Sequence, residues 1–218
     1  MKTKNLFLAL CAALMLSSCG NKTRNDHQSS ECKNHNESQC QHNKADAKEK
    51  TLLLIDIKDV EQNAVSLIAD NWLVVTAGNE ANYNPMTISW GALGQIWGAP
   101  AATIYIRNTR HTYSFIEDNK YFTLCAFPEE HREKVLYIGS NSGRDGNKIE
   151  ATGLTPKNTE LGNIYYDEAN LVIECEKIYF NDLLPENITE PKGIESYKNE
   201  ESVHRMYIGK ILNVWEKR

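Results

Sequence analysis

Hydrophobic and polar positions divide the sequence into three unlike parts. Residues 6–16 form a short apolar run, residues 20–50 contain no Leu, Ile, Val, Met, Phe, Tyr or Trp, and residues 51–218 mix apolar and polar positions throughout. Only the third part has enough apolar residues to bury a core, and its 168 residues suffice for one. We therefore expect one folded domain over residues 51–218.

Within this domain the pattern predicts a mainly β fold with a few helices. Strands are expected over residues 71–77, 101–107, 121–127 and 206–215, which are rich in β-branched and aromatic residues. Between residues 171 and 176, apolar positions alternate with Glu174 and Glu176, the period of a half-buried strand. Irregular segments separate most strands, which favours a barrel over a regular strand–helix alternation.

Two helices are expected between the strands. One has Thr112 as its N-cap and continues through residue 116. The other begins at Pro128, has Glu129 and Glu130 in its first turn, and ends at Gly139.

The N-terminus has the composition of an export signal. Lys2 and Lys4 precede the apolar run, which is far shorter than the roughly 20 residues that span a bilayer. Residues 16–20 (LSSCG) resemble the bacterial lipobox, in which Cys19 would be acylated and would become the first residue after cleavage of residues 1–18. The alternative is an ordinary signal peptide with an incidental cysteine. The lipobox implies a protein of the bacterial cell envelope, on the periplasmic side of a membrane or the cell surface, held only by its lipid anchor.

Residues 19–50 are predicted to be a disordered tether behind the lipidated cysteine. Eleven of the 31 residues from 20 to 50 are charged, and such a segment cannot offset its ordering entropy by burying apolar surface. Its Cys32 and Cys40, with His27, His35 and His42, leave three alternatives: no specific role, a local disulfide, or metal capture. Because their spacing matches no common zinc pattern, no metal site is predicted.

Charge is unevenly distributed. The chain has a net charge of −5 and residues 51–218 a net charge of −8, which argues against nucleic acid as a partner. Residues 81–116 nevertheless contain no acidic residue, and they include Arg107, Arg110 and His111. Residues 140–148 add hydroxyl, glycine and basic residues. These features suit a small anion such as phosphate, although solvated loop residues would look the same.

Familiar catalytic motifs are absent from the sequence. It has no G-x-S-x-G, H-E-x-x-H or Walker loop. His111, His131 and His204 are scattered, and residue pattern alone favours surface or structural roles over that of a catalytic base. Cys125 and Cys175 fall within predicted strands as small apolar residues, with a disulfide between them as the alternative.

Five segments in order resemble the flavin reductase-like family of FMN-binding split barrels, in particular its flavoredoxin-like branch. They are residues 84–90 (NPMTISW, the family's signature loop), 105–113 (YIRNTRHTY), 127–130 (FPEE), 142–148 (SGRDGNK) and 153–156 (GLTP). The resemblance covers roughly residues 65–180. It implies a six-stranded Greek-key split β-barrel, usually a homodimer, with FMN near the dimer interface.

The resemblance also assigns site residues. The isoalloxazine and ribityl chain would be lined by Asn84, Met86, Thr87, Ser89 and Trp90. The phosphate and ribityl chain would be surrounded by Arg107, Arg110, His111 and Thr112, and Ser142, Arg144 and Lys148 would complete the anion site. Two positions depart from the family pattern: Asn108 stands where a proline often follows the strand arginine, and His111 stands where an aromatic residue is common.

The function implied is an FMN-dependent oxidoreductase. Flavin carries the hydride and electron chemistry, so the missing catalytic triad is no objection. NAD(P)H or a redox protein would be the partner. Because NAD(P)H is cytosolic and a lipoprotein domain faces outward, two alternatives stay open: a tethered flavin electron carrier that does not use NAD(P)H, and a flavin-binding lipoprotein without turnover.

Overall fold

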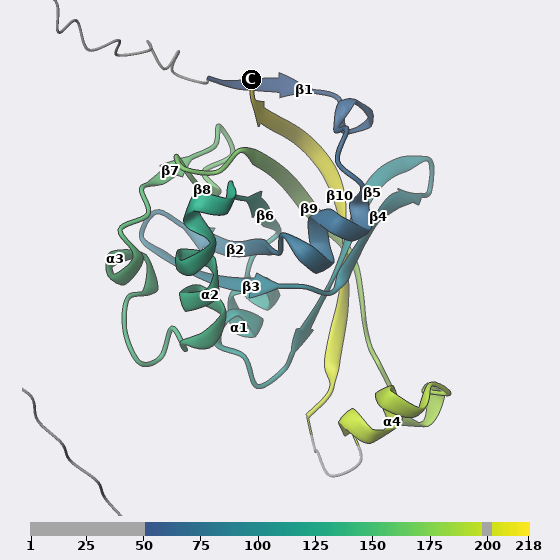
Figure 1. The fold of residues 1–218 in the computed structure, drawn as a ribbon. Coiled ribbons are helices and arrows are strands. Elements are labelled where there is room, and N and C mark those ends of the chain that lie inside the picture. Colours follow the sequence, from purple (N-terminus) through teal and green to yellow (C-terminus); the bar gives the residue numbers. More distant parts are fainter. Residues whose placement is uncertain (1–50, 198–201) are drawn as a thin grey trace, which may run out of the picture. The chain divides into compact units, whose positions relative to one another are not determined.

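The computed structural model describes residues 51–197 and 202–218, all within the unit Ala47–Arg218 (Figure 1). The predicted signal, Cys19 and the tether with its Cys and His residues lie outside the described residues.

Eight antiparallel strands form the main sheet. They are β1 (Leu52–Ile55), β2 (Leu73–Asn79), β3 (Asn82–Ile88), β4 (Gly91–Ile96), β5 (Ala99–Arg107), β6 (Tyr121–Ala126), β9 (Leu171–Asp182) and β10 (His204–Lys217). Their order is β3-β2-β6-β9-β10-β5-β4, and β1 adds to β10. The mainly β fold class is confirmed, with eight strands in the sheet where the resemblance implied six.

The sheet wraps around one core without closing. Ile88 on β3 belongs to this core and Leu93 on β4 packs against it, although these strands lie at opposite ends of the sheet order. Among the described strands, β3 and β4 do not pair, so the barrel is split along this seam. Ser89 and Trp90 carry the chain across it. Residues 84–88, expected as part of a loop, are strand; β3 tolerates Pro85 because an edge strand need not donate on both sides.

Short helices and a small ribbon cover the sheet. The helical elements are η1 (Ile57–Asp59), η2 (Ser66–Asp70), α1 (His111–Asp118), η3 (Glu129–His131), α2 (Arg132–Ser140), α3 (Lys148–Thr152), η4 (Pro185–Asn187) and α4 (Pro191–Tyr197); β7 (Pro156–Asn158) pairs with β8 (Ile164–Tyr166). Both α1 and α2 pack against β3 (Figure 1). Across the described ranges, the helices lack the length and apolar character needed to cross a membrane.

The two predicted helices occur with different starts. Arg110, and not Thr112, occupies the N-cap of α1, because the Thr112 hydroxyl is buried and accepts a hydrogen bond from the Asn84 amide. Pro128 caps the short helix η3, and α2 follows it, so the predicted helix 128–139 is two elements.

Both faces of the central strands are buried, which explains their nearly continuous apolar runs. Val75, Leu124 and Ile173 point into the barrel core, whereas their neighbours Val74 and Val172 point into a second cluster. Side chains of α2, α3 and β8 complete the second cluster. Successive residues of a strand face opposite sides, so both layers depend on the same strands.

Glu174 corrects the expectation of a half-buried strand β9. Its side chain is buried, and its two carboxylate oxygens accept hydrogen bonds from Asn163 Nδ2 and Asn213 Nδ2, each at 2.7 Å. Glu176, two residues later, is partly exposed and forms an ion pair with Lys120 at 2.9 Å. The predicted exposure is confirmed for Glu176 and is wrong for Glu174, because β8 and its flanking turn cover the sheet face on which Glu174 lies.

Cys125 and Cys175 are buried free thiols. Cys175 points into the barrel core and Cys125 into the second cluster, so the two sulfur atoms lie on opposite faces of the sheet. Burial raises the pKa of both thiols, that of Cys125 to about 12. They act as small apolar core residues, and the alternative of a disulfide is wrong.

Candidate functional site

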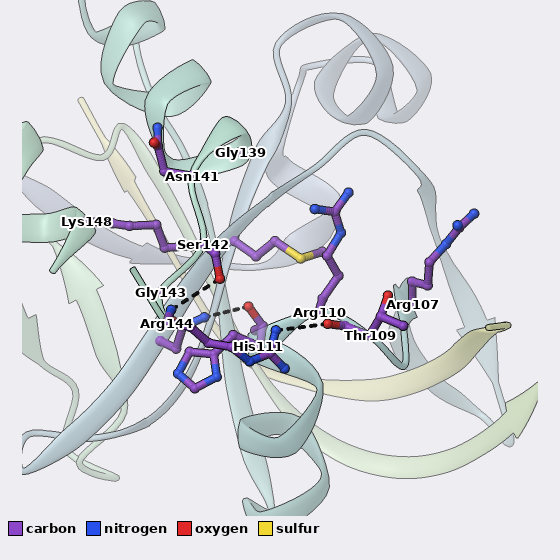
Figure 2. Close-up of a pocket in the computed structure, with 13 residues that line it drawn as sticks. Arg107, Thr109, Arg110, His111, Gly139, Asn141, Ser142, Gly143, Arg144 and Lys148 are labelled. Carbon is purple, nitrogen blue, oxygen red and sulfur yellow. Dashed lines mark hydrogen bonds between the residues drawn. The ribbon is translucent and has the colours of Figure 1, made fainter. Parts of the chain in front are cut away.

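Two adjoining pockets lie where β3, the end of β5 and α1 meet residues 139–148. The first, called the basic pocket, has a volume of about 280 Å³ (Figure 2). It is lined by Asn84, Met86, Arg107, Thr109, Arg110, His111, Thr112, Gly139, Asn141, Ser142, Gly143, Arg144 and Lys148. The second, called the aromatic pocket, has a volume of about 400 Å³ and is lined by Met86, Thr87, Ile88, Ser89, Trp90, Tyr105, Arg107, Arg110 and His204. Because Met86, Arg107 and Arg110 line both, the two pockets share a wall.

All twelve site residues predicted from the sequence line one or both pockets. The basic pocket contains Asn84, Met86, Arg107, Arg110, His111, Thr112, Ser142, Arg144 and Lys148. The aromatic pocket contains Met86, Thr87, Ser89, Trp90, Arg107 and Arg110. Segments more than 50 residues apart in sequence are thus brought to one place.

The charge of the pockets is one-sided. The cations Arg107, Arg110, Arg144 and Lys148 line the basic pocket, and none of the described residues lining either pocket is acidic. In Figure 2, Arg107 and Arg110 lie on one side and Lys148 on the other. The acid-free stretch of the sequence therefore forms a wall with a positive field, which favours an anionic ligand.

The N-terminus of α1 opens into the basic pocket. Arg110 has an extended backbone at the N-cap, its N–H donates to the Arg107 carbonyl at 2.9 Å, and no side chain caps this end of the helix in the described structure. His111 and Thr112, the first two helical residues, line the pocket. Free N–H groups and the helix dipole at such an end favour a bound anion.

Three of the predicted ligand residues also join elements of the fold. The Asn84 amide Nδ2 donates to Thr112 Oγ1 at 2.6 Å and to the Pro85 carbonyl at 3.2 Å, and both Asn84 and Thr112 are buried. Thr87 Oγ1 donates to the Val135 carbonyl at 2.6 Å. These bonds hold β3 against α1 and α2, so the three side chains shape the pocket walls.

Lys148 is a buried cation that bonds backbone carbonyls. Its Nζ donates to the Pro85 carbonyl and, at 3.3 Å, to the Ile138 carbonyl, and the residue is 6% exposed. Burial, and secondarily the charge of Arg110, lowers the pKa of Lys148 to about 8. Lys148 therefore ties β3 to the last turn of α2 while lending the pocket its charge.

The loop after α2 is fixed to the turn before α1. Arg144 Nη1 donates to the Thr109 carbonyl at 3.0 Å, and the Arg144 N–H donates to Ser142 Oγ at 3.2 Å (Figure 2). Beside them, partial burial and the charges of Arg144 and Lys148 lower the pKa of His111. His111 is therefore neutral at pH 7. In this state one ring nitrogen can donate a hydrogen bond and the other can accept one.

The aromatic pocket contains a residue that the sequence reasoning did not select. The ring centroids of Trp90 and His204 are 4.9 Å apart, and a hydrogen bond joins His204 Nδ1 to the Tyr197 hydroxyl. His204 reaches the pocket because β10 pairs with β5 in a register that sets His204 opposite Arg107. Tyr105, Gly139 and Asn141 were missed too. Only the strand pairing and loop path reveal these positions, and neither has a local sequence signal.

Comparison with known families agrees with this geometry. The sequence profile of the family described as Flavin reductase like domain matches residues 65–218. The chain belongs to the flavin reductase-like family. No curated protein gave a significant match.

Solved structures similar to this flavin reductase-like chain come from several microbes. An FMN-binding domain of a flavin reductases-like enzyme from Shewanella baltica OS155 matches with a TM-score of 0.57 and 16% identity over 77% of this chain and 78% of the other. Flavoredoxin of Desulfovibrio vulgaris (Miyazaki F) matches with a TM-score of 0.53 and 21% identity over 67% and 69%. An FMN-binding protein from Thermus thermophilus with bound p-hydroxybenzaldehyde matches with a TM-score of 0.53 and 20% identity over 67% and 71%. At these identities the likeness establishes the fold, while the family supports a flavin-binding, oxidoreductase-type function.

Proposed function

We propose that this chain binds FMN in the two adjoining pockets and acts as an FMN-dependent oxidoreductase of the flavin reductase type. One observation carries the proposal: a basic pocket without acidic lining adjoins a pocket edged by Met86, Trp90 and His204. FMN has parts in the same arrangement, a phosphate of about two negative charges joined through a ribityl chain to a planar ring.

The basic pocket suits the phosphate end. Arg110 and Arg144 are guanidinium donors at its wall, the N-terminus of α1 adds backbone N–H groups, and Ser142 adds a hydroxyl. Gly143 lets the loop backbone approach closely, since a Cβ there would stand 2.0 Å from Asn84 Oδ1. Charge-assisted bonds from arginine and a helix N-terminus are the usual means of holding a phosphate.

The aromatic pocket suits the ring end. Met86 reaches both pockets, and Ser89 and Trp90 follow β3 along the seam of the barrel. A flexible thioether and an indole bind flat aromatic surfaces well. The resemblance implies a flavin ring along this strand, and the lining residues support that position.

Bound flavin supplies the hydride and electron transfer itself. The residues of this chain are then needed for two tasks. The arginines and β3 bind and orient the flavin, and the site must leave one part of the ring open to a partner. Trp90 at the seam is 51% exposed, so the aromatic pocket is accessible to solvent and to a second molecule.

Flavin analysis and reduction test this function. The full chain purified in detergent should be yellow and release FMN on denaturation, and anaerobic NADH or NADPH should bleach its absorbance near 450 nm. A preparation that is colourless and takes up no FMN would contradict the proposal.

A tethered electron carrier is the second candidate, and the leader sequence favours it. We propose that Cys19 is acylated and anchors the chain in the cell envelope, where NAD(P)H is absent. Bleaching by dithionite but by neither nicotinamide nucleotide would select the carrier. Retention of a Cys19→Ala variant in the membrane fraction would contradict the anchor. Tight, exchangeable FMN without reduction by any physiological donor would indicate a non-catalytic flavin-binding lipoprotein.

A homodimer is also proposed, from the resemblance and from exposed aromatic residues. Trp97 is 72% exposed, and its ring lies 6.3 Å from that of Tyr179, which is also exposed. Large exposed aromatic side chains are typical of association surfaces. Light scattering on the purified protein distinguishes a dimer from a monomer.

A further inference from the structure

The two ends of α1 are bonded differently. At its N-terminal end, which opens into the basic pocket, no side chain caps the helix within the described residues. At its C-terminal end, side chains bond three consecutive backbone carbonyls. Asn119 Nδ2 donates to the Phe115 carbonyl at 2.8 Å. Lys177 Nζ donates to the carbonyls of Ile116 and Glu117, at 2.5 and 2.8 Å. The C-terminal end is therefore held in place, while the N-terminal end is left for a ligand.

Lys177 supplies a cation to the negative end of this helix. The last turn of α1 contains Glu117 and Asp118 and no basic residue, so the cation comes from β9. The negative end of a helix dipole lies at the C-terminus, and a cation there offsets a field that opposes an anion at the other end. Because α1 has eight residues, it is about 12 Å long, and the Lys177 ammonium and the basic pocket lie at its opposite ends.

The side chain of Glu117 fixes the same end of α1. Its Oε1 accepts from the Tyr207 hydroxyl at 2.6 Å and its Oε2 from Arg205 Nη1 at 3.1 Å. Arg205 also bonds both carboxylate oxygens of Asp182, at 2.6 and 3.0 Å, and its guanidinium lies 5.4 Å from the centre of the Tyr113 ring. A bidentate arginine–carboxylate pair has a well-defined geometry. One network of side chains thus joins α1 to β9 and β10.

These contacts can act on a flavin only through the helix. Neither Lys177 nor Glu117 lines the basic or the aromatic pocket, and neither falls in the five segments that carry the family resemblance. Glu117 follows His111, the first residue of α1, by about 9 Å along the helix axis. A short helix moves as a unit, so a tilt of its C-terminal end displaces its first N–H groups. Ligand-binding groups need their places fixed to within about 0.5 Å by supporting contacts of this kind.

We propose that Lys177 and Glu117 are positioning residues for phosphate recognition. Held from β9 and β10, α1 presents its N-terminus to the phosphate of the flavin, and the Lys177 ammonium offsets the opposing field of its C-terminal end. The inference rests on the proposed flavin function. Its signature is specific, because FMN carries the phosphate and riboflavin does not: loss of these contacts weakens FMN and leaves riboflavin nearly unchanged.

The test titrates full-length apoprotein with FMN and with riboflavin and compares the ratio of the two Kd values. Lys177→Met removes the ammonium, and Lys177→Arg keeps the charge. Tyr207→Phe leaves the ring in the core and removes only the hydroxyl that bonds Glu117. Lys120→Met is the matched control, because this exposed lysine bonds Glu176 and Tyr121 and its loss removes the same charge. The melting temperature of each variant is measured alongside.

We expect the preference for FMN over riboflavin to fall about two- to fivefold in Lys177→Met. Tyr207→Phe should lower it by a smaller factor, Lys177→Arg should retain most of it, and Lys120→Met should keep all of it. Equal weakening of both flavins in Lys177→Met would show only support of the fold and would overturn the inference. An equal fall in Lys120→Met would overturn it too, since any nearby charge would then suffice.

Failure of the inference is distinguishable from failure of the proposed function. A wild type without saturable flavin binding would contradict both. A wild type that prefers FMN, together with a Lys177→Met variant that keeps the full preference, would contradict this inference alone. If Lys177→Met does not fold, Tyr207→Phe decides: a reduced preference supports the positioning role, and an unchanged one overturns it.

Discussion

The backbone of Gly143 lies directly against the side chain of Asn84, so closely that a Cβ on Gly143 would stand 2.0 Å from Asn84 Oδ1 and 2.9 Å from the His111 ring. The loop after α2, strand β3 and the start of α1 therefore share one wall of the basic pocket. Because that wall has no room for a Cβ, the shape of the pocket depends on a glycine at position 143.

Gly143→Ala should weaken flavin binding. The added methyl must push the loop away from Asn84 and His111, which displaces Ser142 and Arg144, and we expect a loss of about tenfold or more in FMN affinity, since overpacking costs about 1–3 kcal/mol. Gly94→Ala on β4 is the matched control, because its Cβ would have no neighbour within 4 Å. Fluorescence titration of both variants measures the effect, and equal affinities would show that the contact does not shape the site.

Lys148→Met should weaken both FMN and riboflavin, and FMN somewhat more, because the pocket wall is loosened and also loses a positive charge. The ammonium bonds the Pro85 and Ile138 carbonyls, so its removal takes a donor from each, although the Pro85 carbonyl keeps the Asn84 amide, and we expect a cost of about 1–3 kcal/mol in unfolding free energy. Arg110→Gln, which removes charge from the pocket wall, should instead weaken FMN much more than riboflavin. Urea denaturation and paired flavin titrations separate the roles; a selective loss of FMN in Lys148→Met would make Lys148 a phosphate ligand first.

His111 should make the protein more sensitive to acid. Its pKa is lowered in the folded state by burial and by Arg144 and Lys148, so the unfolded chain takes up the proton first as the pH falls. The stability it contributes is complete above the ordinary histidine pKa of about 6.5 and is lost as the pH falls through that value toward the lowered one. Melting temperature should therefore decline less between pH 7 and 5 in His111→Gln than in wild type. His131→Gln, outside both pockets, is the control, and identical slopes for all three proteins would refute the assignment.

Glu174→Gln should destabilise the fold more than Glu176→Gln. Both carboxylate oxygens of Glu174 accept from asparagine amides, those of the buried Asn163 and the partly buried Asn213, and a glutamine would set one N–H₂ against another. We expect a loss of about 1–3 kcal/mol. Glu176, on the same strand, makes an ion pair with the exposed Lys120, and solvent screening makes the contribution of such a pair to stability small. Urea midpoints of the two variants test the difference, and a smaller shift for Glu174→Gln would contradict it.

The sequence predicts the inner strands of the sheet better than its edge strands. It also predicts which residues line the site better than it predicts the contacts of each one. Strands β2, β5, β6, β9 and β10 have strong apolar patterns, and all five were found near their predicted positions. Strands β3 and β4 were not predicted, because Pro85 and the glycines at 91 and 94 read as loop, and only their edge positions make them compatible with a sheet.

The individual roles within the site required the three-dimensional arrangement. Asn84, Thr87 and Lys148 are predicted to contact the ligand, and the structure adds that their polar groups bond to Thr112, to the Val135 carbonyl and to two further carbonyls. The position of a residue in a motif indicates that it borders a site, but it does not indicate which atoms its side chain contacts. His204 was passed over because its place beside Arg107 follows from strand register across nearly 100 residues.

Titration of the full-length apoprotein with FMN, followed by quenching of flavin fluorescence and repeated with riboflavin, tests the central claim most directly. The account predicts saturation at one FMN for each chain and an affinity for FMN at least about tenfold above that for riboflavin, because the arginines and the α1 N-terminus bond only the phosphate. The preference should vanish in an Arg110→Gln/Arg144→Gln variant. Absence of saturable binding, or equal affinity for the two flavins in wild type, would contradict the account.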